Sequence, residues 1–244
     1  MIISAQQRLL TLSCGSQIHV VPTPLRRDDA NSPWCYTFSL SPVIIDEEVS
    51  TSSLPPRANF LATQVWPSSR TASTIIEQYL DPSWKVCELG CGPGLPSLTA
   101  AAKGSEVIAT DLDECALEMV EAAARDQGYL DDQRFRTQQF DLTSRQNILP
   151  EADLYIMSDV FESSKVAEGA AFHVQSILSK NSNSKSKRRV WVFAQSDRAQ
   201  RETFLSVMRE TYDETLKWTL TQALNPIDLE LWLCDLDETA VEYN

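Results

Sequence analysis

The chain has 244 residues, of which 43% are hydrophobic and 23% are charged, a composition typical of one globular domain with or without a modest appendage. Its 34 acidic and 21 basic residues give a formal net charge of −13. Such a surface repels nucleic-acid phosphates and attracts cationic partners such as lysine-rich proteins. No apolar run approaches the roughly 18 to 20 residues that cross a bilayer. We therefore expect neither nucleic acid nor a membrane as the partner.

Residues 1–60 are interpreted as a β-hairpin and loop extension. Residues 8–13 and 17–22 alternate in hydrophobicity around Gly15, which predicts two antiparallel strands, and the prolines that follow forbid long helices. The same stretch has no acidic residue before Asp28 and contains arginine, serine and threonine, which is also the composition of an organelle transit peptide.

From residue 61 onwards, short apolar runs alternate with helical segments. We predict strands over 84–89, 106–110, 134–140, 153–158 and 190–195, and helices over 69–80, 95–103, 113–127, 163–180 and 198–212. This alternation is typical of a doubly wound, Rossmann-like α/β fold, in which helices cover both faces of a parallel sheet. We assign it to one domain over 61–244.

Two further strands are predicted at the end of the chain, over 216–222 and 229–236. The loop between them contains Asn225-Pro226 and is too short for a crossover helix, so it permits only an antiparallel pair. We therefore expect a C-terminal antiparallel hairpin to close the parallel sheet.

The six cysteines are scattered along the chain. The closest pair, Cys87 and Cys91, does not have the CxxC spacing of redox and zinc motifs, and His19 and His173 are the only histidines. Idle thiols are typical of a reducing compartment. We therefore expect no metal site and a cytoplasmic protein, with a mitochondrial or other organellar location as the alternative.

The sequence VCELGCGPG at residues 86–94 is the clearest motif. A predicted strand runs into Glu88, and Gly90, Gly92 and Gly94 follow at every second position, where glycine lets the backbone turn tightly and approach a ligand. A dinucleotide fingerprint would place its third glycine where Leu95 stands. The G-x-G-x-G spacing after an acidic residue is instead typical of loops that bind S-adenosylmethionine, whose cationic amine Glu88 can balance.

Acidic residues also stand at the ends of the next three predicted strands. Asp111 can accept hydrogen bonds from both ribose hydroxyls, while Asp113 is better placed to cap the following helix. Asp141 can take the adenine amino group, and Asp159, preceded by Ser158, lies where the sulfonium methyl should point. The carboxyl ends of parallel strands meet at one edge of the sheet, where ligands of such folds bind.

With this loop and these acids, the chain resembles the class I, seven-β-strand S-adenosylmethionine-dependent methyltransferases. More narrowly, it resembles methyltransferase family 16, whose members are largely protein-lysine methyltransferases. The resemblance covers the chain from the hairpin to the last strand and implies a seven-stranded sheet, S-adenosylmethionine as cofactor and a monomer.

Three further positions carry this resemblance. Trp66-Pro67 is similar to the Trp-Pro-small-small segment of the family, in which the tryptophan helps to cover the cofactor; a core aromatic is the alternative. Leu142 stands where many members have a tryptophan against the adenine, and Ser158 replaces the usual small residue before the motif acid. The expected cofactor-binding residues are Trp66, Glu88, Gly90, Cys91, Gly92, Gly94, Asp111, Leu112, Asp141, Leu142 and Ser158.

Residues 159–162 read Asp-Val-Phe-Glu, which resembles the family's Asp-x-x-Tyr motif at the acid and departs from it at Glu162. Residues 153–162, together with residues 190–200, are most similar to the branch that methylates the electron-transfer flavoprotein β-subunit. Residues 192–195 are also similar to the calmodulin-lysine branch. The resemblance therefore implies a protein substrate that presents a lysine.

A lysine amine has a pKa of about 10.4 in water and must lose its proton before it attacks a methyl group. We expect Asp159 to hold and orient the amine and Glu162 to assist or to accept the proton, which makes these two the expected catalytic residues. Phe161 is either a wall of the substrate site or part of the core. A small-molecule N- or O-methyltransferase and a non-catalytic cofactor-binding partner protein are the alternatives.

Overall fold

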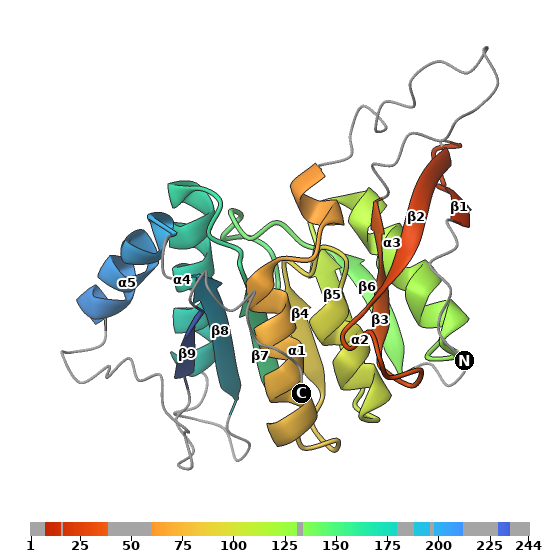
Figure 1. Cartoon of the computed structure of the whole chain (residues 1–244). Coiled ribbons are helices and arrows are strands. Elements are labelled where there is room, and N and C mark those ends of the chain that lie inside the picture. Colours follow the sequence, from red (N-terminus) through yellow and green to blue (C-terminus); the bar gives the residue numbers. More distant parts are fainter. Residues whose placement is uncertain are drawn as a thin grey trace.

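The computed structural model describes residues 8–15, 17–38, 60–130, 134–179, 188–195, 198–211 and 229–234. They form a six-stranded sheet in the order β6-β5-β4-β7-β8-β9 and a three-stranded sheet in the order β1-β2-β3 (Figure 1). The strands are β1 (Arg8–Thr11), β2 (Gln17–Pro24), β3 (Trp34–Phe38), β4 (Val86–Leu89), β5 (Val107–Asp111), β6 (Phe135–Gln139), β7 (Leu154–Ser158), β8 (Arg189–Gln195) and β9 (Leu229–Cys234). The helices are η1 (Phe60–Thr63), α1 (Pro67–Tyr79), α2 (Leu95–Ala102), α3 (Glu114–Asp126), α4 (Ser164–Ser179) and α5 (Gln200–Thr211).

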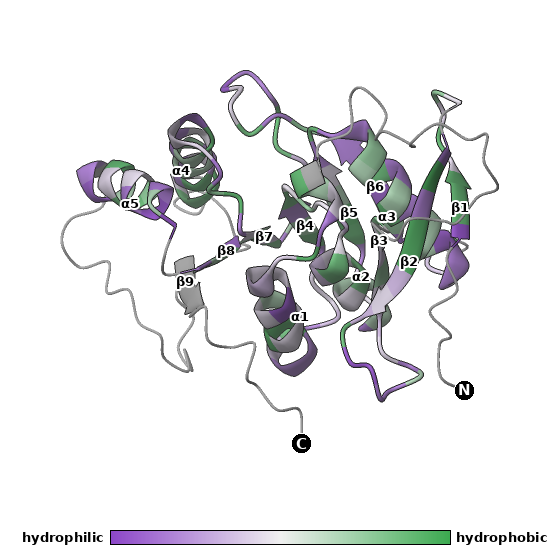
Figure 2. Ribbon diagram, turned by 45° about the horizontal axis from the view of Figure 1, so that its top comes forward, coloured by the Kyte–Doolittle hydropathy of each residue, from purple (hydrophilic) through white to green (hydrophobic). Residues whose placement is uncertain are grey.

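The six-stranded sheet is buried on both faces. Along β7, Leu154 and Ile156 pack into a core with α1, α2 and α3, whereas Tyr155 and Met157 pack into a second core with α4 and α5. The sides alternate because successive side chains of a strand point to opposite faces. Figure 2 shows α1 and α2 on one side of the sheet and α4 and α5 on the other. The doubly wound fold is thus confirmed.

The predicted N-terminal hairpin is also confirmed, since β1 and β2 pair antiparallel with Arg8 opposite Val20. The prolines predict loops after it, but β2 continues to Pro24 and pairs with β3 from Val20 onwards. Within the described residues, β1 pairs with β2 only as far as Val20, and no described strand lies on that side of Pro22 and Pro24. A proline is tolerated where its missing N–H would face an unpaired edge.

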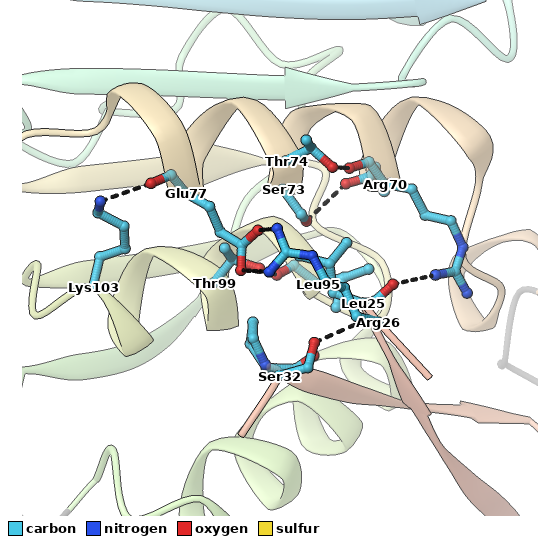
Figure 3. A network of polar contacts seen from close by, with 12 residues as sticks. Leu25, Arg26, Ser32, Arg70, Ser73, Thr74, Glu77, Leu95, Thr99 and Lys103 are labelled. Carbon is cyan, nitrogen blue, oxygen red and sulfur yellow. Dashed lines mark hydrogen bonds and ion pairs between the residues drawn. The ribbon is translucent and has the colours of Figure 1, made fainter. Parts of the chain in front are cut away.

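Polar contacts connect the N-terminal sheet to α1, and α1 to α2 (Figure 3). Arg26, in the connection between β2 and β3, binds Glu77 on α1, with Nη1 3.1 Å from Oε1. Lys103, after α2, donates from Nζ to the Glu77 carbonyl over 2.8 Å, and Arg70 on α1 donates to the Pro24 carbonyl over 3.2 Å. Apolar residues of the extension join the same core as α2 and α3, namely Leu12, Ile18, Val20, Leu25, Cys35 and Tyr36.

Only one strand of the expected C-terminal hairpin falls within the described residues. This strand, β9, pairs parallel with β8, with Val190 opposite Leu229 and Gln195 opposite Cys234. The helix α5 lies between the two strands in the chain, as a parallel crossover requires. The other predicted strand, over 216–222, lies outside the described residues, so the hairpin and the seventh strand stay predictions.

Candidate active site

A cavity of about 450 Å³ opens at the carboxyl ends of the central strands. This is the edge at which open α/β sheets bind their ligands. Each strand contributes through the segment that follows it, and the segment around the start of α1 closes one side. The lining residues are Leu61, Ala62, Trp66, Ser69, Gly90, Cys91, Gly92, Pro93, Asp111, Leu112, Asp113, Phe140, Asp141, Leu142, Thr143, Ser158, Asp159, Val160, Glu162, Val166 and Arg198.

The glycine loop joins β4 to α2 along this cavity. Gly90, Gly92 and Gly94 have φ values of 74°, 49° and 73°, in the left-handed region that side chains disfavour. Gly90 and Gly92 line the cavity, but Gly94 does not. A Cβ on Gly94 would lie 2.7 Å from a methyl group of Val120, so this glycine lets α2 pack closely on α3.

Glu88 lies beneath the loop and does not line the cavity. Its side chain is fully buried, and its Oε2 accepts hydrogen bonds from the N–H (3.0 Å) and the hydroxyl (2.6 Å) of Ser97 at the start of α2. Its Oε1 accepts a third bond from the hydroxyl of Ser158 (3.3 Å). Burial raises the pKa of Glu88 to about 8. Because Glu88 does not line the cavity, its position does not support a direct contact with the cofactor's amine. The carboxyl group instead stabilises the loop through its hydrogen bonds to Ser97 and Ser158.

Asp111 ends β5 and faces the cavity. Its two oxygens accept backbone N–H bonds from Gly92 (2.8 Å) and Asp113 (2.9 Å). Each carboxylate oxygen can accept a second bond, so the pair can still receive two neighbouring hydroxyls. Asp113 caps α3 by accepting from Cys115 N and Ala116 N, which confirms its predicted role. The exposed side chain of Leu112 and the buried thiol of Cys91 complete this part of the wall.

The loop after β6 forms the opposite wall. Oδ1 of Asp141 accepts from the N–H (2.8 Å) and the hydroxyl (2.7 Å) of Thr143, which closes a tight turn. Leu142 is buried, and its carbonyl lies 2.1 Å from where a Cβ on Gly169 of α4 would stand. One turn further along α4, burial lowers the pKa of His173, which keeps the imidazole neutral. The lack of a side chain on Gly169 thus lets α4 pack closely against this loop.

The motif acid Asp159 is held differently from what the sequence predicts. It follows β7 with φ at +60°, and its side chain is fully buried. Its Oδ1 accepts a hydrogen bond of 3.0 Å from Nε of Arg198. The guanidinium carbon of Arg198 lies 5.0 Å from the centre of the Trp66 ring, within cation–π distance. The structure therefore places an arginine where Asp159 was expected to receive a lysine amine.

The other residues of the motif separate into cavity and core. Glu162 lines the cavity and is exposed to solvent. Phe161 is buried, with its ring 5.1 Å from that of Phe204 on α5, so it belongs to the core and is not a wall of the substrate site. Ser158 lines the cavity and donates a hydrogen bond to Glu88, which does not line it. The hydroxyl of Ser158 also lies 3.2 Å from the hydroxyl of Ser69 on α1.

Of the predicted site residues, all except Glu88 and Gly94 line the cavity. The main residue that sequence reasoning missed is Arg198. The other site residues were predicted because they are polar and follow a strand, and Arg198 follows β8 in the same way. It was missed because the helix predicted over 198–212 begins at this residue. Ser69 was missed as well, since nothing in α1 distinguishes it from the serines around it.

Within the described residues, no group of three or more histidine, cysteine, aspartate or glutamate side chains is arranged to hold a metal ion. In the same part of the chain, none of the helices combines the length and the apolar character needed to cross a membrane.

Residues 56–211, more than half of the chain, match the lysine methyltransferase family. The comparison with curated proteins gives no match. Among solved structures, the chain is similar to a TehB-like SAM-dependent methyltransferase from Corynebacterium glutamicum (18% identity, TM-score 0.42, covering 56% of this chain and 71% of that one). It is also similar to TrmN from Thermus thermophilus (23%, 0.35, 46% and 33%) and to coclaurine N-methyltransferase bound to N-methylheliamine and SAH (19%, 0.35, 43% and 32%). At these identities and TM-scores, the likenesses say nothing about the acceptor.

Proposed function

Because the chain belongs to the lysine methyltransferase family, we propose that it methylates the side-chain amine of a lysine in a partner protein. Membership makes the chain an S-adenosylmethionine-dependent methyltransferase, whereas the protein acceptor is the proposal. The observation that carries it is Glu162, an exposed carboxylate in the cavity wall beyond Asp159. A lysine ammonium is the cationic group that such a carboxylate attracts.

The cavity suits S-adenosylmethionine in shape and in donor set. Gly90 and Gly92 border the cavity without a side chain, Asp111 offers acceptors for the ribose, and the loop of Asp141 and Leu142 provides a wall for the adenine. We assign the sugar to Asp111 and the base to the Asp141 loop. When bound, the cofactor supplies a methyl group on a positively charged sulfur, which leaves as a neutral thioether.

The protein's own part in the reaction is to bind, orient and deprotonate the amine. Glu162 receives the ammonium form, and the proton then passes to Glu162 or through water to solvent. Held in this way, the neutral nitrogen would face the methyl group of the bound cofactor, and such alignment of reacting groups lowers the barrier to displacement. Asp159 does not contact the amine directly in this proposal; it positions Arg198 beside the acceptor.

A small-molecule acceptor is the second candidate. The family's tyrosine is replaced by Glu162, and Arg198 adds a cation to the same wall, so a small molecule that carries both an amine and a carboxylate would also find partners there. Such a compound needs no protein surface beyond the cavity.

Labelled S-adenosylmethionine distinguishes the two candidates. The protein is incubated with the labelled cofactor and a lysate of its source cell, and label is followed in proteins and in the small-molecule fraction. We expect a labelled protein whose modified residue is lysine by mass spectrometry, and much weaker labelling with the Asp111→Ala variant at a limiting cofactor concentration. Label confined to the small-molecule fraction would favour the second candidate, and turnover of neither would overturn the proposal.

We also propose that the protein works as a monomer in a reducing compartment, with the cytoplasm as the first place to look. The described cysteines Cys14, Cys35, Cys87, Cys91 and Cys115 are all free thiols, as is usual where thiols are kept reduced. The strongly acidic chain suits a basic protein partner better than a nucleic acid or an anionic membrane surface.

A further inference from the structure

Arg198 is a cation fixed on two sides at the edge of the cavity. Its Nε donates to the buried carboxylate of Asp159 over 3.0 Å, and its guanidinium carbon lies 5.0 Å from the ring centre of Trp66. Trp66 is itself held, because its Nε1 donates to the Leu61 carbonyl over 3.0 Å. A guanidinium held in this way loses little conformational entropy when it binds a further group.

The two terminal nitrogens of Arg198 have no hydrogen-bond partner among the described residues. The side chain is 29% exposed, lines the cavity and uses only Nε for Asp159. A guanidinium presents five N–H donors, and the two terminal groups match the two oxygens of a carboxylate. The arrangement therefore leaves a preorganised anion-binding edge at the cavity.

The order of the strands places this edge on the acceptor's side. Along the sheet the order is β5, β4, β7 and β8, and the ribose acid and glycine loop follow β5 and β4. Asp159 follows β7, and Arg198 follows β8, one strand further from the glycine loop. Glu162 lies on the same side and makes no hydrogen bond or ion pair with the described residues. Among the described residues, this side of the cavity thus presents one acid and one guanidinium edge that have no partner.

We propose that Arg198 binds a carboxylate of the acceptor, so that the methylated lysine stands beside an aspartate or glutamate of the substrate protein. The inference rests on the proposed function and names a feature of its substrate. Glu162 then takes the amine and Arg198 takes the acid. Asp159 and Trp66 are positioning residues, because they act through Arg198.

The test compares Arg198→Lys and Arg198→Gln with Arg209→Gln as the control. Arg209 is an exposed arginine on α5, the helix that follows Arg198; it forms an ion pair of 3.7 Å with Glu202 and does not line the cavity. The lysine variant retains the charge opposite the buried Asp159 but loses the planar fork. The glutamine variant loses the charge as well, so it carries the greater risk to folding.

Two quantities are measured for each variant: the affinity for S-adenosylmethionine by calorimetry, and the KM and kcat for the protein identified by labelling. We expect unchanged cofactor affinity and a KM about 10- to 100-fold higher in Arg198→Lys, the factor that matches loss of one charge-assisted hydrogen bond. Replacing the neighbouring acid of the substrate by its amide should raise KM to the same degree for the wild-type enzyme. The same replacement should have little further effect in the variant, since both changes remove one contact.

Three outcomes would overturn the inference. Lysines methylated by the wild-type protein with no acid beside them would show that the acceptor does not need Arg198. Loss of cofactor affinity in Arg198→Lys would assign the edge to the cofactor's own carboxylate. If the acid-to-amide change in the substrate raised KM as much for the Arg198→Lys variant as for the wild type, the acid would not bind Arg198. Absence of any methylated protein would instead remove the proposed function itself, while normal cofactor binding would still show a folded enzyme.

Discussion

Glu88 and Ser97 are joined by two hydrogen bonds beneath the glycine loop. Oε2 of Glu88 accepts from the backbone N–H over 3.0 Å and from the hydroxyl over 2.6 Å. Ser97 lies in the first turn of α2, where N–H groups have no partner within the helix. The buried carboxyl group therefore stabilises the start of the helix that the glycine loop leads into, and Glu88 supports the cofactor site without bordering it.

This contact predicts a pH-dependent stability. Burial raises the pKa of Glu88 from 4.5 to about 8, so over that interval the folded protein retains a proton that the unfolded chain releases. The free energy of unfolding should therefore fall as pH rises from 4.5 towards 8. The Glu88→Gln variant should show a flatter profile, measured by urea unfolding without cofactor. Glu121→Gln, at an exposed position on α3, is the control; an equal slope in wild type and Glu88→Gln would contradict the prediction.

Asp111→Ala should weaken the binding of S-adenosylmethionine. The variant loses the acceptors for the ribose and the bond from Gly92 N that holds the loop. The expected loss is about 1.5 to 3 kcal/mol, the usual contribution of hydrogen bonds to a charged group, measured by calorimetry. Glu121→Ala removes an acid whose partner Arg125 is exposed and should change nothing. Unchanged affinity in Asp111→Ala would remove Asp111 from the ribose site.

Substitutions of two glycines of the loop should have different effects. A Cβ on Gly92 would lie 3.3 Å from the Ala62 carbonyl at the cavity edge, so Gly92→Val should abolish cofactor binding while the protein still folds. The left-handed conformation adds a cost of about 1 to 2 kcal/mol.

A Cβ on Gly94 would instead meet Val120 at 2.7 Å inside the core, so Gly94→Val should lower the midpoint of thermal unfolding much more than Gly92→Val. Calorimetry and thermal unfolding of both variants test this difference. A Gly92→Val protein that binds normally would show that the loop does not contact the ligand.

Asp159→Asn should separate binding from chemistry. The substitution keeps the size of the side chain but removes the negative charge that holds Arg198. We expect near-normal affinity for S-adenosylmethionine and a loss of methyl transfer of roughly 10²-fold or more, the scale of a positioned polar group in catalysis.

The readouts for Asp159→Asn are calorimetry and initial rates with the labelled protein substrate. Joint loss of cofactor binding and activity would make Asp159 a cofactor-binding or structural residue. Full activity would show that the pair with Arg198 has no part in the reaction.

The parts of the site that follow single strands could be predicted from the sequence. The glycine loop, Asp111, Asp141 and Ser158-Asp159 each come directly after an apolar run, and parallel strands bring their carboxyl ends to one edge whatever the details of packing. The cap at Asp113 and the N-terminal hairpin were also predictable, because each depends on a pattern of a few neighbouring residues. Even so, β3 was missed, since the prolines of β2 are acceptable only at a strand edge that the sequence does not reveal.

The amino-acid sequence by itself determined the order of strands and helices, the glycine loop and the line of acids, because these depend on side-chain periodicity and on backbone conformations that only glycine adopts readily. Only the tertiary structure decided which acids border the cavity. Alternation along β4 points Glu88 towards α2 and Ser97, whereas the segment after β8 brings Arg198 against Asp159, 39 positions earlier in the chain. Such pairings depend on how strands and helices pack, and burial then decides which charges remain available to a ligand.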